Sequence, residues 1–564
     1  MNILGINYLS ESSICLVNNG KLKFAVSEER LNRIKNWYGN PYNSIDHCLK
    51  ENKLNLSKID IISTHGTSSY STKEASPHKE YLVAIKEINR SSLSKKNKSF
   101  LIGQLKFREV KEKKAYLRNK KLIDEIKKKY KKKIEIFDHH LCHAASAAFF
   151  SGWKNCLVLT IDGYGDSSSS KLFEFKNNKF NQLRSSSILN SLGYFYGSIT
   201  KYLGFKPQRH EGKILGLAAY GNPNKAYGIM KKLIYFDKKK KNFKGGFKNG
   251  YLPLFDNEYY KKIFKGYSKE DISAAAQKRL EEVVLSYVKS INKKNYRLAL
   301  AGGVFANVKL NQKISQLKNV KEIFIFPNMG DGGLCVGAAA LSYNLKTKKN
   351  LKKIKNIYLG KEFSNLDILK TIKKFKLKYL MGSQINKIVA KKLYEGKVVA
   401  LFNGRMEFGP RSLGNRSILS RATDPNINQT LNNKLKRTEF MPFAPITLSE
   451  NFEEMYIGAK KNKKACEYMT ITLDCTKKMK KISPAAIHVD GTARPQIVNK
   501  KENPRLHKIL KNYFIISNIP NLINTSFNMH EEPIVYSPSD ALRGFLQSKI
   551  DYLYIGNYLI SKDQ

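Results

Sequence analysis

The hydrophobic positions of the chain fall into short runs of strand length, separated by longer stretches with helical spacing. Residues 2–6, 59–63, 157–161 and 297–301 are such runs, and each is followed by polar or glycine residues. Residues 272–291 instead repeat apolar positions every three or four residues, which predicts an amphipathic helix. Strands alternating with helices predict an α/β chain whose ligand loops follow the carboxyl ends of strands.

Two lysine-rich stretches interrupt this alternation. Residues 72–133 are charged, with helical spacing in places, and we expect an exposed helical excursion that contributes no core. Residues 346–355 read as a linker. The length of 564 residues suits two domains or more. We therefore predict one domain over 1–355 and a second α/β domain over 356–564, with no sequence repeat of fixed period.

Composition narrows the class of protein. A hydrophobic content of 41% and an aromatic content of 11% fit a soluble globular enzyme. The apolar runs are far shorter than the roughly 20 residues that span a bilayer. The start MNILGINYL has no basic region or cleavage site, so we expect no signal peptide. The 7 cysteines form no C-x-x-C pair, which indicates a reducing cytoplasm and no zinc ribbon.

The formal net charge of +55 has two interpretations. One is binding to nucleic acid or to an anionic membrane. The other is a lysine-rich composition spread over the whole surface. The lysines occur as many short runs, such as 127–133, 238–241 and 460–464, which favours the second interpretation. We expect no dedicated nucleic-acid partner, while a field that favours acidic substrates stays open.

The segment 402–419, FNGRMEFGPRSLGNRSIL, follows a short apolar run and concentrates arginine and glycine. Proline fixes one backbone angle and the preceding glycine frees another, so the loop has a defined shape. Planar guanidinium groups suit phosphate or carboxylate ligands. A basic surface loop held by ion pairs is the alternative. The candidate anion-binding residues of the loop are Arg405, Arg411 and Arg416.

Further cationic, hydroxyl and amide donors lie downstream of this loop. Such groups stabilise the charge that develops on a transferring phosphoryl or acyl-phosphate group. No Walker A motif and no G-x-S-x-G elbow is found. The additional candidates are Lys436, Arg437, Arg494, Ser526 and Asn528.

Two histidines four residues apart, His139 and His143, stand at the predicted start of a helix. That spacing places both imidazoles on one helix face, as paired metal ligands require. Asp162 and Asp331 each follow a predicted strand, where ligand groups collect. Together they suit iron, manganese or zinc. Histidines that only cap or pack a helix are the alternative, and His140 points off the shared face.

Glycine-rich turns follow three of the predicted strands. Such turns let backbone amides approach phosphate or ribose closely, and the arrangement resembles the actin-like sugar-kinase and heat-shock ATPase architecture. A further segment, HEGKILGLAAYG at 210–221, adds Glu211 and Lys213, for which an ordinary salt-bridged helix start is the alternative. The candidate nucleotide-binding residues are Gly163, Gly165, Gly302, Gly303, Asn307 and Gly332.

Motifs along the whole chain resemble the NodU and the cephem and tobramycin O-carbamoyltransferases, which make carbamate esters of sugar or antibiotic hydroxyls. The strings are SEERLNRIK at 27–35, DHHLCHAASA at 138–147, LTIDGYGD at 159–166, SLGYFYGSIT at 191–200, GKILGLAAYG at 212–221, LALAGGVFAN at 298–307, GDGG at 330–333, GRMEFGPRSLGNRSIL at 404–419, TEFMPFAP at 438–445, HVDGTARPQ at 488–496, NTSFN at 524–528 and DYLYIGNYLI at 551–560. GRMEFGPRSLGNRSIL and HVDGTARPQ are the most specific of these.

The resemblance implies an actin-like (ASKHA, Kae-type) first domain and a YrdC-like second domain. The second would build carbamoyl adenylate from carbamoyl phosphate and ATP, with Mg²⁺ accompanying ATP, and release phosphate and pyrophosphate. It would use Arg411, Arg416, Arg494, Ser526 and Asn528 with Lys436 or Arg437. The first would hold a divalent metal, iron before manganese or zinc, on His139, His143, Asp162 and Asp331. Gly302, Gly303 and Asn307 would bind the adenylate, and Lys35 of SEERLNRIK joins the substrate-binding candidates.

The chain departs from the family pattern at one place. The family reads His-Asp-Ser near the N-terminus, whereas this chain has Ser10, Glu11 and Ser12. That histidine is a candidate base for the acceptor hydroxyl, and a serine hydroxyl cannot take this role near neutral pH. Glu11 is our candidate replacement, with His65 or His210 as alternatives.

We therefore predict a cytoplasmic, ATP-dependent O-carbamoyltransferase that could act as a homodimer. Its acceptor is a sugar or natural-product hydroxyl, which leaves a nodulation-type oligosaccharide, an antibiotic and a surface-polysaccharide sugar open. A small-molecule kinase of the actin-like fold and a basic RNA-binding protein are the competing hypotheses.

Overall fold

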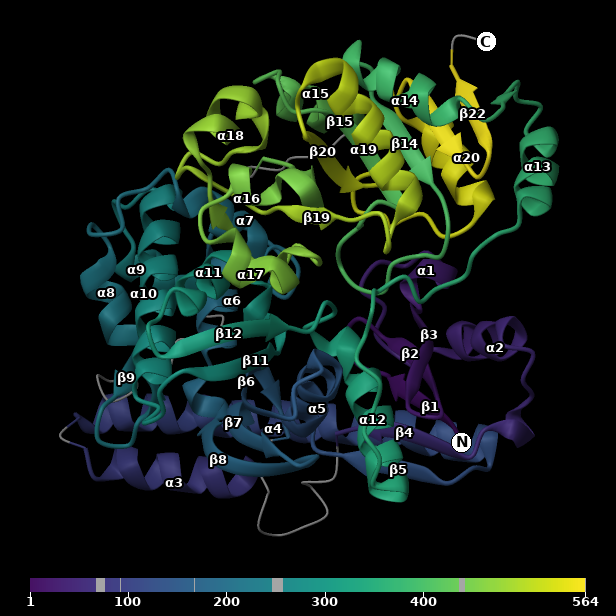
Figure 1. The fold of residues 1–564 in the computed structure, drawn as a ribbon. Coiled ribbons are helices and arrows are strands. Elements are labelled where there is room, and N and C mark those ends of the chain that lie inside the picture. Colours follow the sequence, from purple (N-terminus) through teal and green to yellow (C-terminus); the bar gives the residue numbers. More distant parts are fainter. Residues whose placement is uncertain (67–76, 92, 167, 246–256, 436–441, 563–564) are drawn as a thin grey trace. The chain divides into compact units, whose positions relative to one another are not determined.

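The computed structural model describes residues 1–66, 77–91, 93–166, 168–245, 257–435 and 442–562 (Figure 1). Its contacts group into two units. The first comprises Met1–Leu22, Tyr38–Pro41 and Leu54–Lys353, and the second comprises Lys23–Trp37, Tyr42–Lys53 and Ile354–Gln564. The chain is divided after Lys353, and two N-terminal segments group with the C-terminal part; the domains 1–355 and 356–564 stay a prediction. Within the described residues, no helix has both the length and the apolar character needed to cross a membrane.

Two five-stranded sheets belong to the first unit, apart from residues 23–27 of the first sheet, which group with the second unit. The first sheet has the order β3 (Lys21–Ser27), β2 (Ser13–Asn18), β1 (Asn2–Asn7), β4 (Ile61–His65) and β5 (Ile134–Phe137). The second has the order β8 (Lys179–Ser187), β7 (Ser168–Lys176), β6 (Asn155–Gly165), β11 (Tyr296–Ala301) and β12 (Val320–Ile325). Counted along the chain, the first strand of each sheet runs antiparallel to the second strand and parallel to the fourth. The fourth strand is in turn parallel to the fifth.

The two sheets therefore share one strand order, 3-2-1-4-5, although the sequence shows no repeat. A duplicated α/β unit of this order is typical of the actin-like fold. The prediction of an α/β chain with an actin-like first domain is confirmed.

Two helices occupy equivalent places in this duplication, because each follows the fifth strand of its sheet. They are α5 (His139–Ser151) and α12 (Leu334–Thr347), and they pack against each other. Contact between them is close: a Cβ placed on Gly337 would lie 1.8 Å from the carbonyl oxygen of Cys142. The small residues of both helices allow this approach, and the helix starts carry the ligands described below.

The lysine-rich excursion forms two helices, α3 (Pro77–Asn89) and α4 (Lys95–Tyr130), between β4 and β5. Helices were expected here, but the structure differs in burial. Tyr81, Leu101 and Leu105 form a buried cluster with Ile188 and Leu189, which follow β8. The hairpin is therefore packed onto the first unit, because apolar residues recur on one face of otherwise charged helices.

The remaining helices of the first unit lie around the second sheet. They are α6 (Leu192–Tyr202), α7 (Glu211–Ala218), α8 (Tyr227–Leu233), α9 (Asn257–Ile263), α10 (Lys269–Lys289) and α11 (Val308–Ser315), with the small hairpin of β9 (Ile234–Asp237) and β10 (Asn242–Gly245).

An eight-stranded mixed sheet forms the second unit. Its order is β13 (Leu380–Met381), β22 (Tyr558–Ser561), β21 (Tyr552–Ile555), β14 (Val399–Phe402), β15 (Arg416–Arg421), β20 (Asn521–Ser526), β16 (Ala444–Leu448) and β19 (Gln496–Val498). A short pair, β17 (Leu473–Asp474) and β18 (Thr492–Ala493), lies outside it. This is the α/β architecture expected for the second domain, and its YrdC-like character stays a prediction.

The helices of the second unit come from both ends of the chain. From the N-terminal segments come α1 (Glu29–Asn32) and α2 (Tyr42–Glu51). The others are α13 (Asn365–Lys374), α14 (Ile385–Tyr394), α15 (Ile427–Leu435), α16 (Phe452–Met455), α17 (Ala459–Cys466), α18 (Lys477–Ile482), α19 (Pro504–Ser517) and α20 (Pro538–Gln547).

Candidate functional site

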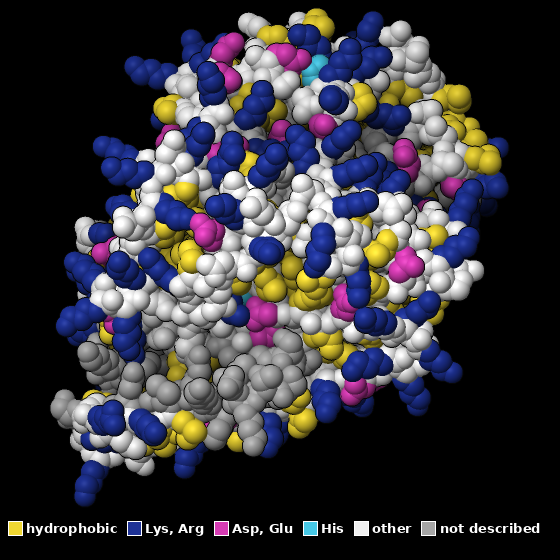
Figure 2. Space-filling model, turned by 60° about the horizontal axis from the view of Figure 1, so that its bottom comes forward, with side chains coloured by type: hydrophobic (Ala, Val, Ile, Leu, Met, Phe, Trp, Pro, Cys, Tyr) yellow, Lys and Arg dark blue, Asp and Glu magenta, His cyan; other side chains and the backbone are white. Residues whose placement is uncertain are grey.

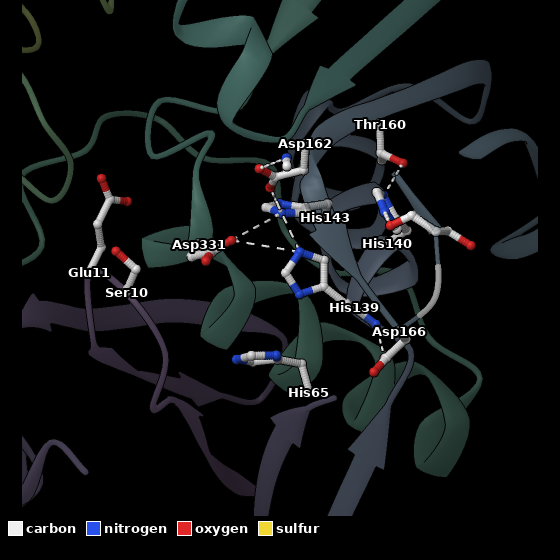
Figure 3. A network of polar contacts seen from close by, with 12 residues as sticks. Ser10, Glu11, His65, His139, His140, His143, Thr160, Asp162, Asp166 and Asp331 are labelled. Atoms are coloured by element: carbon white, nitrogen blue, oxygen red, sulfur yellow. Dashed lines mark hydrogen bonds and ion pairs between the residues drawn. The ribbon is translucent and has the colours of Figure 1, made fainter. Parts of the chain in front are cut away.

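The four predicted metal ligands of the first unit come together (Figure 3). His139 and His143 lie on the first turns of α5, Asp162 lies in β6, and Asp331 follows β12. Their nearest nitrogen and oxygen atoms all lie within 4.8 Å of one another. The His143 Nε2 is 2.9 Å from the Asp162 Oδ2. The spacing argument from sequence therefore identified residues that share one small volume.

The remaining distances in this cluster are longer than hydrogen bonds. The Nε2 of His139 lies 3.7 Å from the Asp162 Oδ2 and 3.6 Å from the Asp331 Oδ1. Nε2 of His143 also lies 3.6 Å from the Asp331 Oδ1. Among the described residues, the buried Nε2 of His139 has no hydrogen-bond partner. Two imidazole nitrogens and two carboxylates face one shared volume, and most of the distances between them are too long for hydrogen bonds. Such an arrangement fits a divalent cation.

Burial and charge act in opposite directions on these groups. Burial would lower the pKa of His143, but the hydrogen-bonded Asp162 carboxylate and the nearby Asp331 carboxylate raise it to about 9. Burial likewise opposes ionisation of Asp162, yet His139 and His143 hold its pKa well below the usual value. The histidine side chains are 2% and 0% exposed, whereas the Asp162 and Asp331 carboxylates are 18% and 23% exposed. A ligand can therefore approach the cluster from its carboxylate side.

Neighbouring groups fix the start of α5. The Asp138 carboxylate caps the helix by accepting from the Leu141 N–H at 2.8 Å, and the backbone N–H of His139 donates to the Asp166 carboxylate at 2.8 Å. His140 points away from the cluster and contacts the Thr160 hydroxyl at 2.9 Å. It therefore orients the helix start, as its position off the shared face suggested.

The glycine turns approach the same cluster through their backbones. Gly302 has φ +102°, and a Cβ there would lie 2.2 Å from the Ile161 carbonyl oxygen. A Cβ on Gly303 would lie 3.2 Å from the Asp162 Oδ1, and one on Gly165 would lie 2.1 Å from the His139 ring. The Gly163 N–H donates to the Asp162 Oδ1 at 2.7 Å. These predicted nucleotide-binding residues thus lie next to the four candidate metal ligands.

Asn307 is engaged in holding two helices. Its side chain accepts from the Leu310 N–H at 3.0 Å, which caps α11, and donates to the Gln277 side chain of α10 at 2.8 Å. Glu211 begins α7 and accepts from the Gln208 N–H at 2.6 Å, while burial raises the pKa of Glu211. The Lys213 ammonium lies 5.8 Å from the centre of the Phe205 ring. Their contacts are those of helix starts, although all three stay candidates for ligand binding.

The turn that replaces the family histidine lies beside Asp331 (Figure 3). The Gly332 N–H donates to the Glu11 carboxylate at 3.2 Å, so Glu11 is held one residue from a predicted ligand. His65 is fully buried, donates from Nε2 to the Asn7 Oδ1 at 2.8 Å, and packs edge-on against His139. Burial and the charges of His139 and His143 lower the pKa of His65 well below its usual value. His210 precedes α7 and its Nδ1 accepts from the Lys206 N–H at 3.3 Å.

In the second unit, two of the three loop arginines are used to build the loop. The Arg416 guanidinium is fully buried, donates to the Asn403 and Gly404 carbonyls at 2.7 and 3.3 Å, and stacks on the Phe402 ring at 3.7 Å. Burial lowers the pKa of Arg416 to about 10. Arg405 donates to the carbonyls of Gly360 and Leu359 at 2.9 and 2.7 Å. Both side chains therefore hold backbone in place in this structure.

Glu407 organises the same loop and was missed from the sequence. One oxygen of its buried carboxylate accepts from the N–H groups of Leu413, Asn415 and Arg416 at 2.8, 2.8 and 3.2 Å. It is the single carboxylate within the arginine-rich segment 402–419, and that contrast is the signal that could have identified it.

Hydrogen bonds from neighbouring strands fix the Arg411 end of the loop. The Asn524 side chain of β20 donates to the Ser412 carbonyl at 3.1 Å, and the Gln496 side chain of β19 donates to the Leu413 carbonyl at 2.9 Å. Arg411 and Arg494 each stand two residues before one partner of the second bond. The second bond therefore joins the two segments that carry these arginines, which are distant in sequence.

The NTSFN segment, residues 524–528, lies at the end of β20, next to β15. Ser526 lies opposite Ser417 in the pairing of β15 with β20, and its hydroxyl donates to the Asn528 side chain at 2.6 Å. Asn528 in turn donates to the carbonyls of Met529 and Glu532 at 2.8 and 3.0 Å. The candidates Lys436 and Arg437 lie outside the described residues.

The SEERLNRIK segment belongs to this unit, which the sequence did not indicate. The buried Arg30 donates to the Gly409 carbonyl of the arginine loop at 3.2 Å. Arg33 donates to the carbonyls of Ile534 and Pro533, both at 2.8 Å. Lys35 follows in a half-buried turn. The two arginines of the motif were the available signal, but nothing in the sequence says which domain they serve.

Basic side chains are scattered over the molecular surface. Figure 2 shows Lys and Arg side chains distributed over the described part of the visible face, interleaved with apolar and acidic ones. On this face the distribution agrees with the compositional interpretation of the charge.

Comparison with known proteins places the chain within one family along its length. The description "Carbamoyltransferase N-terminus" matches residues 2–340, and "Carbamoyltransferase C-terminus" matches residues 390–562. The uncharacterized protein MJ1058 of Methanocaldococcus jannaschii is 32% identical over 612 residues, which covers 100% of both chains. These matches confirm the resemblance found in the sequence motifs.

Two relatives with descriptive names are also similar. Nodulation protein NolNO of Sinorhizobium fredii is 30% identical over 572 residues, covering 98% of this chain and 79% of that protein. The 3'-hydroxymethylcephem-O-carbamoyltransferase of Streptomyces clavuligerus is 26% identical over 361 residues, which covers 63% of this chain and 65% of that enzyme.

Proposed function

Because the chain belongs to the carbamoyltransferase family, we propose that it is an ATP-dependent O-carbamoyltransferase working in two half-reactions. The second unit makes carbamoyl adenylate, and the metal cluster of the first unit is where the carbamoyl group passes to an acceptor hydroxyl. The observation that carries the proposal is the convergence of His139, His143, Asp162 and Asp331 in a chain matched by both carbamoyltransferase descriptions.

In the first half-reaction, water cleaves carbamoyl phosphate to carbamate and phosphate. A carbamate oxygen then attacks the α-phosphorus of ATP, and the bond to the β-phosphate breaks to release pyrophosphate. Both steps gather negative charge, which guanidinium and hydroxyl donors stabilise. We assign this role to Arg411, Arg494 and Ser526, while Arg416 and Glu407 keep the loop in its shape.

In the second half-reaction, the acceptor oxygen attacks the carbamoyl carbon and the bond to AMP breaks. The hydroxyl proton must pass to a base, and we assign this role to Glu11, whose carboxylate is positioned by the Gly332 N–H. We assign the adenylate to the backbone turn at Gly302 and Gly303, and the close approach of this turn to Ile161 and Asp162 supports the assignment. A divalent cation bound by the four ligands would supply Lewis-acid stabilisation of the developing oxyanion.

The names of two relatives support a hydroxyl group as the acceptor. The cephem enzyme is named an O-carbamoyltransferase, and a second relative is named a nodulation protein. The proposal therefore takes a sugar or natural-product hydroxyl as acceptor, with ATP and carbamoyl phosphate as the other substrates.

The assay that tests this function follows pyrophosphate in mixtures of protein, Mg²⁺ and ATP, with and without carbamoyl phosphate. We expect pyrophosphate only when carbamoyl phosphate is present. If ADP forms instead, or if pyrophosphate is indifferent to carbamoyl phosphate, the proposal fails. When an acceptor with a free hydroxyl is added to the same mixture, Glu11→Gln should keep pyrophosphate release and lose the carbamate ester.

A further inference from the structure

The inserted hairpin of α3 and α4 contacts the surroundings of the metal cluster at two places. First, Tyr164 and Tyr194 pack against its buried cluster. Tyr194 also lies beside the residue after Asp162, since a Cβ on Gly163 would be 3.5 Å from the Tyr194 ring. Second, α4 binds the side chain of Tyr38. The hairpin therefore supports the walls around the site as well as its own core.

Tyr38 lies near the turn that carries Glu11, the proposed base for the acceptor hydroxyl. The next residue, Gly39, donates to the Tyr8 carbonyl at 3.1 Å and accepts from the Ser12 hydroxyl at 2.7 Å, which places it against the turn that carries Glu11. That turn is joined to Gly332 by the Glu11 carboxylate. Burial raises the pKa of Tyr38, Arg118 counteracts this, and the charge of Asp331 raises the pKa further, in agreement with this position.

Arg118 of α4 is fixed on this tyrosine. Its guanidinium carbon lies 4.3 Å from the centre of the Tyr38 ring, and its Nη2 donates to the Tyr38 hydroxyl at 2.8 Å. The tyrosine hydroxyl donates to the Asn119 side chain at 2.7 Å. An arginine stacked on an aromatic ring and hydrogen-bonded to its hydroxyl is already ordered before any ligand arrives.

This guanidinium retains capacity for an anion. Arg118 is exposed, and no carboxylate forms an ion pair with it among the side chains that the structure describes. Lys114 and Lys121 lie four residues before it and three residues after it, so they share its helix face, and both are exposed. A fixed cation flanked by two others is suited to a carboxylate or a phosphate group.

We propose that Arg118, seated on Tyr38, recognises an anionic group on the acceptor, so that the enzyme carbamoylates hydroxyls of molecules bearing a carboxylate or a phosphate. The inference rests on the proposed carbamoyl transfer and names its substrate class. Because a charge-assisted hydrogen bond contributes about 1.5–3 kcal/mol, we expect a preference of about tenfold or more in kcat/KM over a neutral analogue.

The test compares three probes as acceptors: glucose, glucuronate and glucose 6-phosphate. The wild-type protein should carbamoylate one or both anionic sugars at least about tenfold better than glucose, and which of them reacts distinguishes a carboxylate from a phosphate. Arg118→Glu should abolish this preference and Arg118→Lys should keep part of it. Lys120→Glu, with the same charge change on the opposite face of α4, should leave the preference intact.

Pyrophosphate release in the presence of carbamoyl phosphate is measured in every sample. If the wild-type protein releases none, the proposed function fails. If it releases pyrophosphate but prefers glucose, carbamoylates neither anionic sugar, or keeps its preference in Arg118→Glu, the anionic-acceptor inference is overturned while carbamoyl adenylate formation stands.

Discussion

At the scale of single residues, arginines that look equivalent in the sequence have different surroundings. All three arginines of segment 402–419 were predicted to bind anions. The guanidinium of Arg416 is buried among backbone carbonyls, and Arg405 also donates to carbonyls. Arg411 instead is half-buried, in a segment that a hydrogen bond joins to the segment of Arg494. The motif shows where arginines occur, but it does not show whether each one donates its hydrogen bonds to a backbone carbonyl or to a ligand. That depends on the folded backbone around it.

A matched pair of substitutions separates these roles. Arg416→Ala leaves the carbonyls of Asn403 and Gly404 without their donor, and we expect a loss of about 3 kcal/mol in the free energy of unfolding. Arg411→Ala should abolish pyrophosphate release with an almost unchanged melting temperature. Thermal denaturation followed by circular dichroism, alongside the pyrophosphate assay, measures both. Normal turnover in Arg411→Ala would refute its assignment to the substrate site.

The metal cluster gives the second prediction at this scale. The double variant His139→Ala, His143→Ala should lose bound iron, manganese or zinc and the transfer to the acceptor, yet keep pyrophosphate release, because the first half-reaction uses other residues. Metal content is measured by plasma mass spectrometry after purification. His210→Ala, which alters a histidine outside the cluster, is the control and should keep its metal. Unchanged metal content in the double variant would remove these histidines from the ligand set.

At the scale of elements, local sequence patterns predicted where helices and strands lie, but they did not predict which elements pack against each other. Patterns in the sequence indicated the strand that carries Asp162, the strand before Asp331, the helix start at His139 and the small-residue helix after Gly333. The observed strand continues past Asp162 to Gly165, whereas the sequence had suggested an end at Ile161. The packing of α5 on α12 could not be deduced, because it arises from a duplicated topology that left no sequence repeat. The burial of the α3–α4 hairpin depends on contacts with Ile188 and Leu189, which lie far along the chain.

The close approach of α5 and α12 can be tested with one methyl group. In Gly337→Ala the new Cβ would meet the Cys142 carbonyl oxygen at 1.8 Å, so the helices must separate. We expect a loss of about 1–3 kcal/mol in stability and weaker metal binding, since α5 carries both histidines.

Gly103→Ala in α4 is the matched control, because a Cβ there meets nothing within 4 Å. That variant should be as stable as the wild type, or more stable by up to about 1 kcal/mol. Urea denaturation compares the two variants, and equal stabilities would contradict the tight packing of the two helices.

At the scale of the whole molecule, the chain crosses between its two units more often than the sequence suggested. The sequence predicted one domain over 1–355 and another over 356–564, whereas residues 23–37 and 42–53 group with the unit that begins again at Ile354. Long-range pairing of this kind carries no local signal, since the SEERLNRIK segment reads as an ordinary helix start wherever it docks.

This division predicts how fragments behave. The fragment 354–564 lacks Arg30 and Arg33, whose hydrogen bonds reach Gly409, Pro533 and Ile534. We expect it to melt at a lower temperature than the same unit in the full chain and to release little pyrophosphate. Adding a synthetic peptide of residues 23–53 should restore part of the activity. A fragment that forms carbamoyl adenylate at the full rate on its own would contradict the grouping.

The central claim is that ATP is cleaved at its α-phosphate to activate a carbamoyl group. The most direct measurement incubates the full-length protein with ATP labelled at the α-phosphate and with carbamoyl phosphate, in the absence of acceptor, and separates the labelled products. The account predicts labelled carbamoyl adenylate, and labelled AMP as it breaks down, only when carbamoyl phosphate is present. Labelled ADP as the main product, or AMP formed equally without carbamoyl phosphate, would contradict it.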